Sequence, residues 1–182
     1  MNLAAIPAGD ADLLEVNVVI EVPFGGPPIK YEMDKASGAL FVDRFLHTPM
    51  FYPGNYGFIP NTLSEDGDPC DVLVASSHAV QPGAIMQVRP VGVLLMEDEH
   101  GPDEKIIGVP STRLTSRYDT IRSHTDLPPI TRQQIEHFFS HYKDLEAAKW
   151  VKVAGWAGAA TARRLVAAAH ARQLLAGAGE AA

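Results

Sequence analysis

The sequence predicts an α+β fold in which strands come first and helices come last. Residues 15–22 and 29–33 alternate apolar and polar side chains, which is the period of a half-buried strand. From Thr131 onward, apolar side chains recur at helical spacing instead. The 182 residues contain no internal repeat or domain linker, so we expect one domain over residues 1–182. Flexible tails are expected at residues 1–11 and at about 176–182.

The first three strands are expected at residues 15–22, 29–33 and 40–44, with a tight turn at 34–38 joining the second strand to the third. Each strand carries charged side chains as well as apolar ones. These are Glu21, then Lys30 and Glu32, then Arg44. A sheet face open to water explains this pattern as well as a functional surface does.

The middle of the chain is expected to contain one covering loop and three more strands. Residues 48–62 are rich in Pro, Gly, Asn and aromatic residues, so we expect a loop with buried rings, from which Tyr52 and Tyr56 could offer hydroxyl groups to a ligand. The strands are predicted at residues 72–76, 85–96 and 106–109, with Pro90 and Gly92 bending the long one.

Two helices are expected in the last third of the chain. The first should begin at a capping box formed by Thr131 and Gln134, after Pro128-Pro129. His137 and His141 lie opposite its apolar stripe. The zinc-protease pattern is absent because no Glu follows His137, so solvent or a subunit contact is favoured over a metal site. A short strand-like link at 150–153 precedes an Ala-rich helix from about 156 to 175. The apolar stripe of the first helix comprises Ile135, Phe138, Phe139, Tyr142 and Glu146.

Three aspartates fall within the six residues 66–71, immediately before a predicted strand. Gly67 permits a tight turn and Pro69 stiffens it, so the loop presents three carboxylates to one small volume. An ordinary solvated turn is the alternative interpretation. An EF-hand is excluded because Cys70 and Ser77 stand at ligand positions of that motif. All-oxygen ligands favour Mg²⁺, Mn²⁺ or Ca²⁺.

A second acidic loop spans residues 97–105 and leads into the strand at 106–109. A surface turn is the commoner meaning of such a sequence. Two acidic loops attached to strands of one sheet can also face each other across the end of that sheet.

Composition limits the classes of function. A formal net charge of −7 argues against non-specific nucleic-acid binding. The single cysteine suits a reducing compartment, and no secretory signal or long apolar run is present, so we expect a cytoplasmic protein without membrane association. An anionic substrate is compatible with this charge if metal ions reverse the local sign.

The sequence closely resembles the soluble family I inorganic pyrophosphatases of bacterial type, collinearly from about residue 12 to 165. The most specific element is the run Asp-Gly-Asp-Pro-Cys-Asp-Val at 66–72. Cys70 is one departure, because an aliphatic residue is usual there. The other matching segments are Glu21-Val22-Pro23, Lys30-Tyr31-Glu32, Val42-Asp43-Arg44, Tyr52-Pro53-Gly54-Asn55-Tyr56-Gly57, Asp98 with Asp103 and Lys105, and His141-Tyr142-Lys143.

The resemblance implies an OB-like, five-stranded, curved β-barrel with two C-terminal helices packed outside. It implies metal-dependent hydrolysis of inorganic pyrophosphate to two orthophosphates by an activated water, and assembly into a homohexamer. Asp68 is similar to the general base that acts on this water. The implied metal ligands are Asp66, Asp71, Asp98 and Asp103, with Glu21 and Glu32 acting through coordinated water. The implied substrate-binding residues are Lys30, Arg44, Tyr56, Lys105, Tyr142 and Lys143.

Charge supports the need for metal. In that site seven carboxylates face four cationic side chains, a formal charge of −3. The site would repel pyrophosphate unless divalent ions bound as well, and Mg²⁺ is the expected ion, with Mn²⁺ or other divalent ions substituting.

Two other functions are considered. OB-type barrels often bind single-stranded nucleic acid or sugars, and the aromatic segment 51–58 is compatible with base stacking. The negative charge argues against that function. A metal-dependent phosphatase for organic phosphoesters would share the same machinery, but it needs a pocket for the organic group, which the sequence does not locate.

Overall fold

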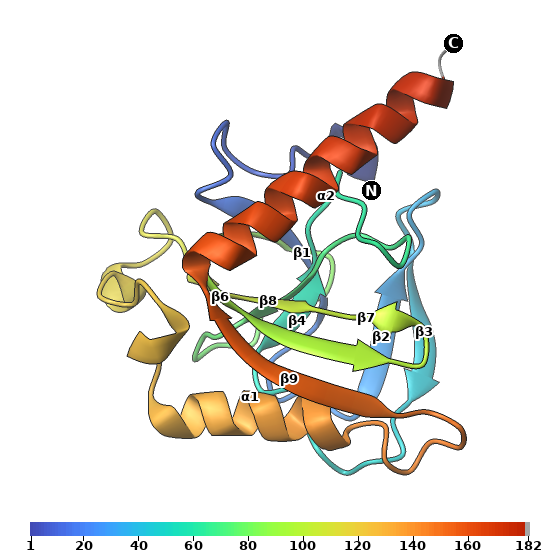
Figure 1. Cartoon of the computed structure of the whole chain (residues 1–182), viewed down its shortest axis with the longest axis vertical. Coiled ribbons are helices and arrows are strands. Elements are labelled where there is room, and N and C mark those ends of the chain that lie inside the picture. Colours follow the sequence, from blue (N-terminus) through green and yellow to red (C-terminus); the bar gives the residue numbers. More distant parts are fainter. Residues whose placement is uncertain (181–182) are drawn as a thin grey trace.

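The computed structural model describes residues 1–180 and has the predicted order of strands before helices (Figure 1). The helices are α1 (Pro129–His141) and α2 (Ala159–Glu180), with the short 3-10 helices η1 (Leu3–Ala5), η2 (Ser116–Tyr118) and η3 (His124–Asp126). The strands are β1 (Val16–Val22), β2 (Ile29–Met33), β3 (Leu40–Phe45), β4 (Asn55–Phe58), β5 (Asp71–Val74), β6 (Ile85–Asp98), β7 (Gly101–Pro102), β8 (Lys105–Pro110) and β9 (Val151–Gly158).

The main sheet is curved into a closed hydrogen-bonded ring. Strands β1, β4, β5, β8 and β6 pair in that order, and β6 pairs again with β1. Closure depends on the length of β6, whose residues 85–88 pair with β1 and whose residues 88–94 pair with β8. The pairing of β6 with β8 shifts register between Pro90 and Gly92, at the predicted bend. The OB-like, five-stranded architecture is therefore confirmed as a ring-bonded curved sheet rather than a strict barrel.

A glycine allows β4 to approach β1 closely. A Cβ atom on Gly57 would lie 1.9 Å from the carbonyl oxygen of Val19, which is backbone and has little freedom to move. Side chains other than hydrogen are therefore excluded at this point of the ring.

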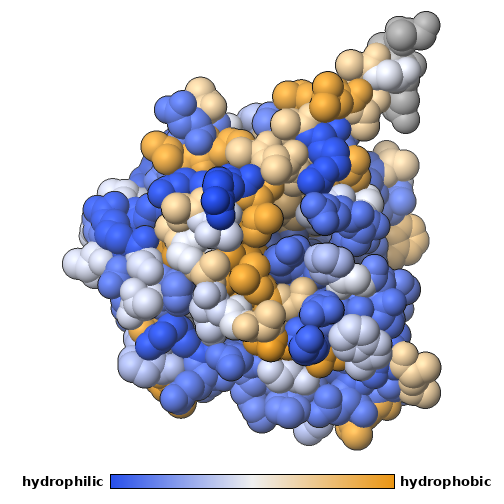
Figure 2. Space-filling model, in the orientation of Figure 1, coloured by the Kyte–Doolittle hydropathy of each residue, from blue (hydrophilic) through white to orange (hydrophobic). Residues whose placement is uncertain are grey.

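The two long helices cover opposite sides of the ring (Figure 1). Helix α1 buries Ile135, Phe138 and Phe139 of its predicted stripe in a cluster that also contains residues of β5, β6 and β8. The expected continuation of the stripe to Glu146 is wrong, because α1 ends at His141. Helix α2 buries Ala162 and Val166 in a second cluster against β1, β5 and β6. Strands β2 and β3 form a separate hairpin beside the ring. Hydrophilic residues cover much of the face shown in Figure 2.

Four expected boundaries were wrong. The covering loop at 48–62 contains β4, because its short aromatic segment fills the gap between β1 and β5. Helix α1 begins at Pro129, and no side chain caps it, so the capping box at Thr131 does not form. Proline already has a backbone angle suited to the first helical turn. The short link expected at 150–153 is part of the longer strand β9. Because pairing with β6 keeps residues 156–158 in the sheet, α2 begins at Ala159 rather than at about residue 156.

The terminal segments expected as tails are packed or helical where the structure describes them. Leu3 is buried and Gly9 forms an isolated bridge with Val16. Residues 176–180 continue α2, whose end projects from the molecule in Figure 1, and residues 181–182 lie outside the described part. The single-domain assignment stays a prediction.

In the described residues, no helix has the length and apolar character required to cross a membrane.

Candidate active site

All the site residues expected from the sequence line one cavity of about 540 Å³. It lies where the hairpin β2–β3 faces the loops before β5 and β8 and the end of α1. The expected residues on its wall are Glu21, Lys30, Glu32, Arg44, Tyr56, Asp66, Asp68, Asp71, Asp98, Asp103, Lys105, Tyr142 and Lys143.

The wall contains further residues, of which the sequence indicated only Tyr52 as a possible contact of a ligand. Glu99 lies in the second acidic loop, so its position was a usable signal. Lys35 in the hairpin turn and Lys149 after α1 belong to no recognisable pattern, since only the folded chain brings them to the cavity. The further lining residues are Tyr52, Phe58, Pro69, His100, Pro102 and Phe139.

The first acidic loop is a closed turn with exposed carboxylates. Gly67 has a φ of +93°, which glycine adopts without strain. The backbone N–H of Asp68 donates to Oδ1 of Asp66 at 3.0 Å, and the N–H of Ser64 donates to the carbonyl oxygen of Asp68 at 2.7 Å. Asp71 follows as the first residue of β5. Asp66 and Asp68 are exposed, so water can reach both carboxylates.

Lys105 joins the two acidic loops at the bottom of the cavity. Its ammonium group is almost fully buried, lies 2.5 Å from Oδ2 of Asp71 and also contacts Oδ1 of Asp103. Burial alone would lower the pKa of Lys105, but the two carboxylates together raise it well above its usual value. The lysine therefore remains protonated between Asp71 and Asp103.

Lys143 forms a second buried ion pair after the end of α1. Its Nζ lies 2.6 Å from Oδ2 of Asp98 and 3.6 Å from Oε1 of Glu99. Asp98 also accepts a hydrogen bond from the N–H of His100 at 2.8 Å. Burial opposes ionisation of Asp98, but the hydrogen bonds from Lys143 and His100 lower its pKa overall.

Glu21 is the most strongly perturbed carboxylate of the cavity. It is 5% exposed, and burial raises its pKa to about 7, although Lys35 at 3.5 Å and the N–H of Met33 at 2.8 Å both favour the charged form. Burial likewise raises the pKa of Asp103. For these carboxylates, the nearby cations do not fully offset the cost of burying a negative charge.

The hairpin places two cations side by side. The register of β2 and β3 pairs Lys30 with Arg44, and both side chains approach Asp43, at 3.1 and 3.7 Å. Lys30 is also 3.6 Å from Glu32, and Nε of Arg44 is 3.3 Å from Oε1 of Glu146. Each cation is three-quarters buried yet lines the cavity, so both can contact an anion bound there.

The donor set of the cavity fits a hard divalent cation. Among the described residues, eight carboxylates and six Lys or Arg side chains line it, a formal charge of −2. No three Asp, Glu, His or Cys side chains of this part of the chain converge tightly enough to hold a metal ion by themselves. Instead, the ammonium group of Lys105 stands between Asp71 and Asp103. The ligands on offer are oxygen atoms, which suit Mg²⁺ or Mn²⁺.

The ring-bonded sheet and its cavity define a class of protein that brings carboxylates able to bind divalent metal ions together with cations able to bind an oxyanion. The family model described as "Inorganic pyrophosphatase" matches residues 18–173. The inorganic pyrophosphatase of Bradyrhizobium diazoefficiens is 64% identical over 166 residues, covering 91% of this chain and 93% of that protein. That of Rhodospirillum rubrum is 57% identical over 156 residues, covering 86% and 87%.

A solved structure agrees with these relatives. The crystal structure of inorganic pyrophosphatase from Thermus thermophilus superimposes with a TM-score of 0.89 at 49% sequence identity, covering 95% of this chain and 99% of that one. The chain belongs to the inorganic pyrophosphatase family. The family resemblance drawn from the sequence is thereby confirmed, whereas the roles of the individual residues stay predictions.

Proposed function

We propose that this protein hydrolyses inorganic pyrophosphate to two orthophosphates in the cavity described above. The observation that carries the proposal is the meeting, in one cavity, of an acidic loop open to water and a pair of buried cations on the hairpin β2–β3. Metal ligands without cations would bind metal only, and cations without metal ligands would bind phosphate without hydrolysing it. Family membership supports the same activity.

The proposed metal is Mg²⁺, with Mn²⁺ able to replace it. Its ligands would come from Asp66, Asp71, Asp98 and Asp103, and Glu21 and Glu32 would act through coordinated water. Bound divalent ions neutralise the phosphates and lower the pKa of a bound water. The negative formal charge of the cavity supports this assignment, because without metal the carboxylates would repel the substrate.

The remaining roles are those that the family resemblance implies, and the exposure and charge of the residues support them. Asp68 is exposed at the tip of its loop and is proposed as the general base that takes a proton from the attacking water. Lys30, Arg44, Lys105 and Lys143 would hold the phosphoryl oxygens as cations. Burial raises the pKa of Tyr56 and of Tyr142, so both hydroxyl groups stay protonated and able to donate a hydrogen bond to phosphate.

Phosphate release by the purified protein tests the proposed activity. Pyrophosphate and a simple phosphomonoester are each supplied with Mg²⁺ or with EDTA. We expect rapid release from pyrophosphate with Mg²⁺, loss of that release with EDTA, and little release from the monoester. Equal release from the monoester would indicate an organic phosphatase. No release with Mg²⁺ or Mn²⁺ would contradict the proposal and favour a binding protein.

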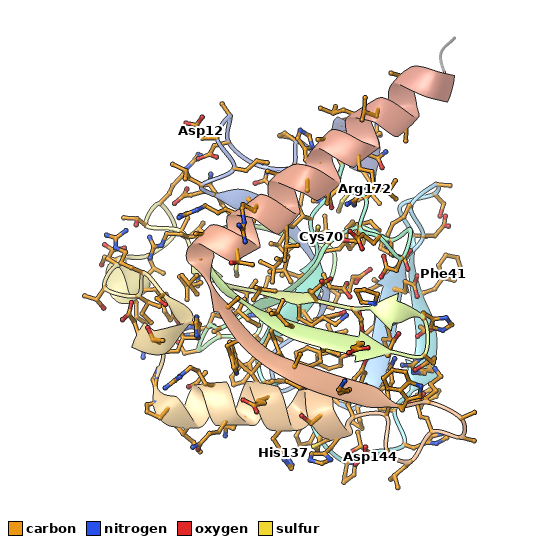
Figure 3. The ribbon with its side chains drawn as sticks, in the orientation of Figure 1. Asp12, Phe41, Cys70, His137, Asp144 and Arg172 are labelled. Carbon is orange, nitrogen blue, oxygen red and sulfur yellow. The ribbon has the colours of Figure 1, made fainter. Side chains whose placement is uncertain are left out.

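We further propose that the protein works in the cytoplasm as a homo-oligomer, with a hexamer as the expected form. His137 and His141 support a contact through α1, because both side chains are exposed and their ring centroids lie 4.6 Å apart. His137 points away from the molecule in Figure 3. Exposed apolar side chains on β3, among them Phe41 and Phe45, support a second contact. Light scattering at pH 7.5 should give a lower mass for a double His→Ala variant. An unchanged mass would exclude the histidines from the contact.

A further inference from the structure

The first acidic loop is anchored from outside the cavity by helix α2. Asp66 and Asp68 are exposed, and the hydrogen bond from the N–H of Asp68 to Oδ1 of Asp66 stays within the loop. The chain segment that leads into them, residues 61–65, instead lies against the second half of α2. None of the α2 side chains that the structure describes lines the cavity of about 540 Å³, so this contact is separate from the site itself.

Leu63 is held to α2 through both of its backbone groups. Its N–H donates to the carbonyl oxygen of Ala169 at 3.0 Å, and its carbonyl oxygen accepts a hydrogen bond from Nη1 of Arg172. The other terminal nitrogen of Arg172, Nη2, lies 3.9 Å from Oε1 of Glu65. One guanidinium group therefore spans two residues on the approach to Asp66, and Arg172 points from α2 toward this loop in Figure 3.

A second side chain of α2 fixes the start of the same segment. Nδ1 of His170 lies 2.8 Å from the carbonyl oxygen of Asn61. The side chain of Asn61 in turn donates to the carbonyl oxygen of Ile6 at 2.7 Å. Residues 61–65 are thus clamped between α2 and the N-terminal segment, and their position depends on both.

Hydrogen bonds within the loop connect this anchor to the carboxylates. The hydroxyl group of Thr62 accepts from the N–H of Cys70 at 2.9 Å, and the N–H of Ser64 donates to the carbonyl oxygen of Asp68 at 2.7 Å. Because Thr62 and Ser64 flank Leu63, a shift of Leu63 moves the groups that close the turn. The placement of Asp66 and Asp68 therefore depends on the contact of Leu63 with α2.

We propose that Arg172 is a positioning residue for the carboxylates of the first acidic loop, which it holds in place through Leu63 and Glu65. The inference rests on the proposed function in that this loop is taken to bind divalent metal. Without the guanidinium group, the metal would have to fix the loop itself and would bind more weakly. Excess metal would then restore the working arrangement, so metal affinity falls more than turnover at saturating metal.

The test compares Arg172→Ala and Arg172→Lys with the control Arg164→Ala. Arg164 lies on the same helix, is exposed, and among the described residues contacts only Thr161 through a hydrogen bond at 3.3 Å. Calorimetric titration with Mg²⁺ alone, without substrate, measures metal affinity directly. The Mg²⁺ dependence of pyrophosphate hydrolysis and the thermal midpoint of the metal-free protein are measured alongside.

We expect Arg172→Ala to weaken Mg²⁺ binding by about tenfold, near the lower end of the loss seen when groups that orient metal ligands are removed. Arg172→Lys should lose about threefold, because an ammonium group keeps the charge but cannot reach both partners in a fixed fork. Turnover at saturating Mg²⁺ should stay within about twofold of wild type, a far smaller change than the loss of a catalytic group would give. Arg164→Ala should match wild type.

Unchanged Mg²⁺ affinity in Arg172→Ala, with or without a lower thermal midpoint, would overturn the inference and leave Arg172 a purely structural role. If Arg172→Ala does not fold, the lysine variant decides by the same criterion. Wild-type protein that binds Mg²⁺ but does not hydrolyse pyrophosphate would contradict the proposed function alone. Wild-type protein that binds no Mg²⁺ would overturn the inference as well.

Discussion

Lys105 is the residue that links the charge of the cavity to its need for metal. Its ammonium group neutralises Asp71 and Asp103, the same carboxylates that are proposed to bind Mg²⁺. In the proposed arrangement it would compete with the metal for these oxygens and would also supply positive charge to the substrate. Removing that one charge should therefore have opposite effects: metal binding should not weaken, whereas substrate binding should.

We predict that Lys105→Gln binds Mg²⁺ at least as tightly as wild type but has a KM for pyrophosphate that is about tenfold higher, the cost of one lost charge-assisted hydrogen bond. Calorimetry with Mg²⁺ and steady-state kinetics at saturating Mg²⁺ measure the two effects. Lys152→Gln, which alters an exposed ion pair with Glu97, is the control. Weaker Mg²⁺ binding by Lys105→Gln would show that the lysine organises the ligands rather than competing with the metal.

The sequence predicted which residues line the cavity, but it did not predict which of them contact one another. Motif spacing and the family resemblance identified thirteen residues that line the cavity together. Neither could indicate that Lys105 lies between Asp71 and Asp103, since that contact depends on the parallel pairing of β5 with β8. Lys35 and Lys149 were missed because single lysines in turns carry no pattern.

At the scale of elements, two glycines should respond in opposite directions to the same substitution. Gly57→Ala would place a methyl group against the backbone of Val19, and we expect it to lower the free energy of unfolding by about 2–3 kcal/mol, as overpacking does. Gly177→Ala lies in α2 with open space around it, and a gain of up to about 1 kcal/mol is expected from helix propensity.

Urea unfolding of both variants measures these changes. A neutral Gly57→Ala would mean that β1 and β4 can separate without cost, which would contradict the closed ring. A destabilising Gly177→Ala would mean that α2 does not extend to this residue in solution.

His124 makes the contact between η3 and β9 sensitive to pH. Its ring stacks on Trp156 with centroids 5.3 Å apart, and its Nδ1 is buried without a hydrogen-bond partner. Burial lowers the pKa of His124, and Arg132 of α1 lowers it further, whereas Asp126 of η3 acts in the opposite sense. The folded protein therefore binds this proton less readily than the unfolded chain does.

Because the folded pKa lies below the unfolded value, the stability that His124 provides is full above about pH 6.5 and should be lost as the pH falls from there through the lower, folded pKa. We predict that the free energy of unfolding falls less between pH 7.5 and 5.5 in His124→Phe, which keeps the stacking but cannot be protonated. Urea unfolding at both pH values measures this. The same pH dependence in both proteins would show that the histidine pKa is not lowered.

Elements with a clear period were predicted correctly, and those that depend on distant partners were not. The strands at 29–33 and 40–45 and the buried face of α1 follow from local patterns. Strand β9 does not, because its last residues, 156–158, run directly into the Ala-rich segment of α2 and stay extended only through pairing with β6. Tertiary pairing here overrides local preference.

For the whole molecule, the ring of strands explains how distant segments share one cavity. Within the ring, the parallel pairing of β5 with β8 sets the loops before these two strands side by side, and the hairpin β2–β3 adds its cations from a separate sheet. The sequence alone predicted an α+β domain, but closure of the ring came only from the family resemblance, since no local pattern specifies which strands pair.

The central claim is that Asp68 takes a proton from the water that attacks pyrophosphate in this cavity. Phosphate release at saturating Mg²⁺ and pyrophosphate should fall by about 10²-fold or more in Asp68→Asn, the usual effect of losing a positioned general base. Asp12→Asn, which changes an exposed carboxylate far from the cavity, should retain wild-type turnover (Figure 3). Wild-type turnover in Asp68→Asn under these conditions would remove Asp68 from the chemical step and contradict the claim.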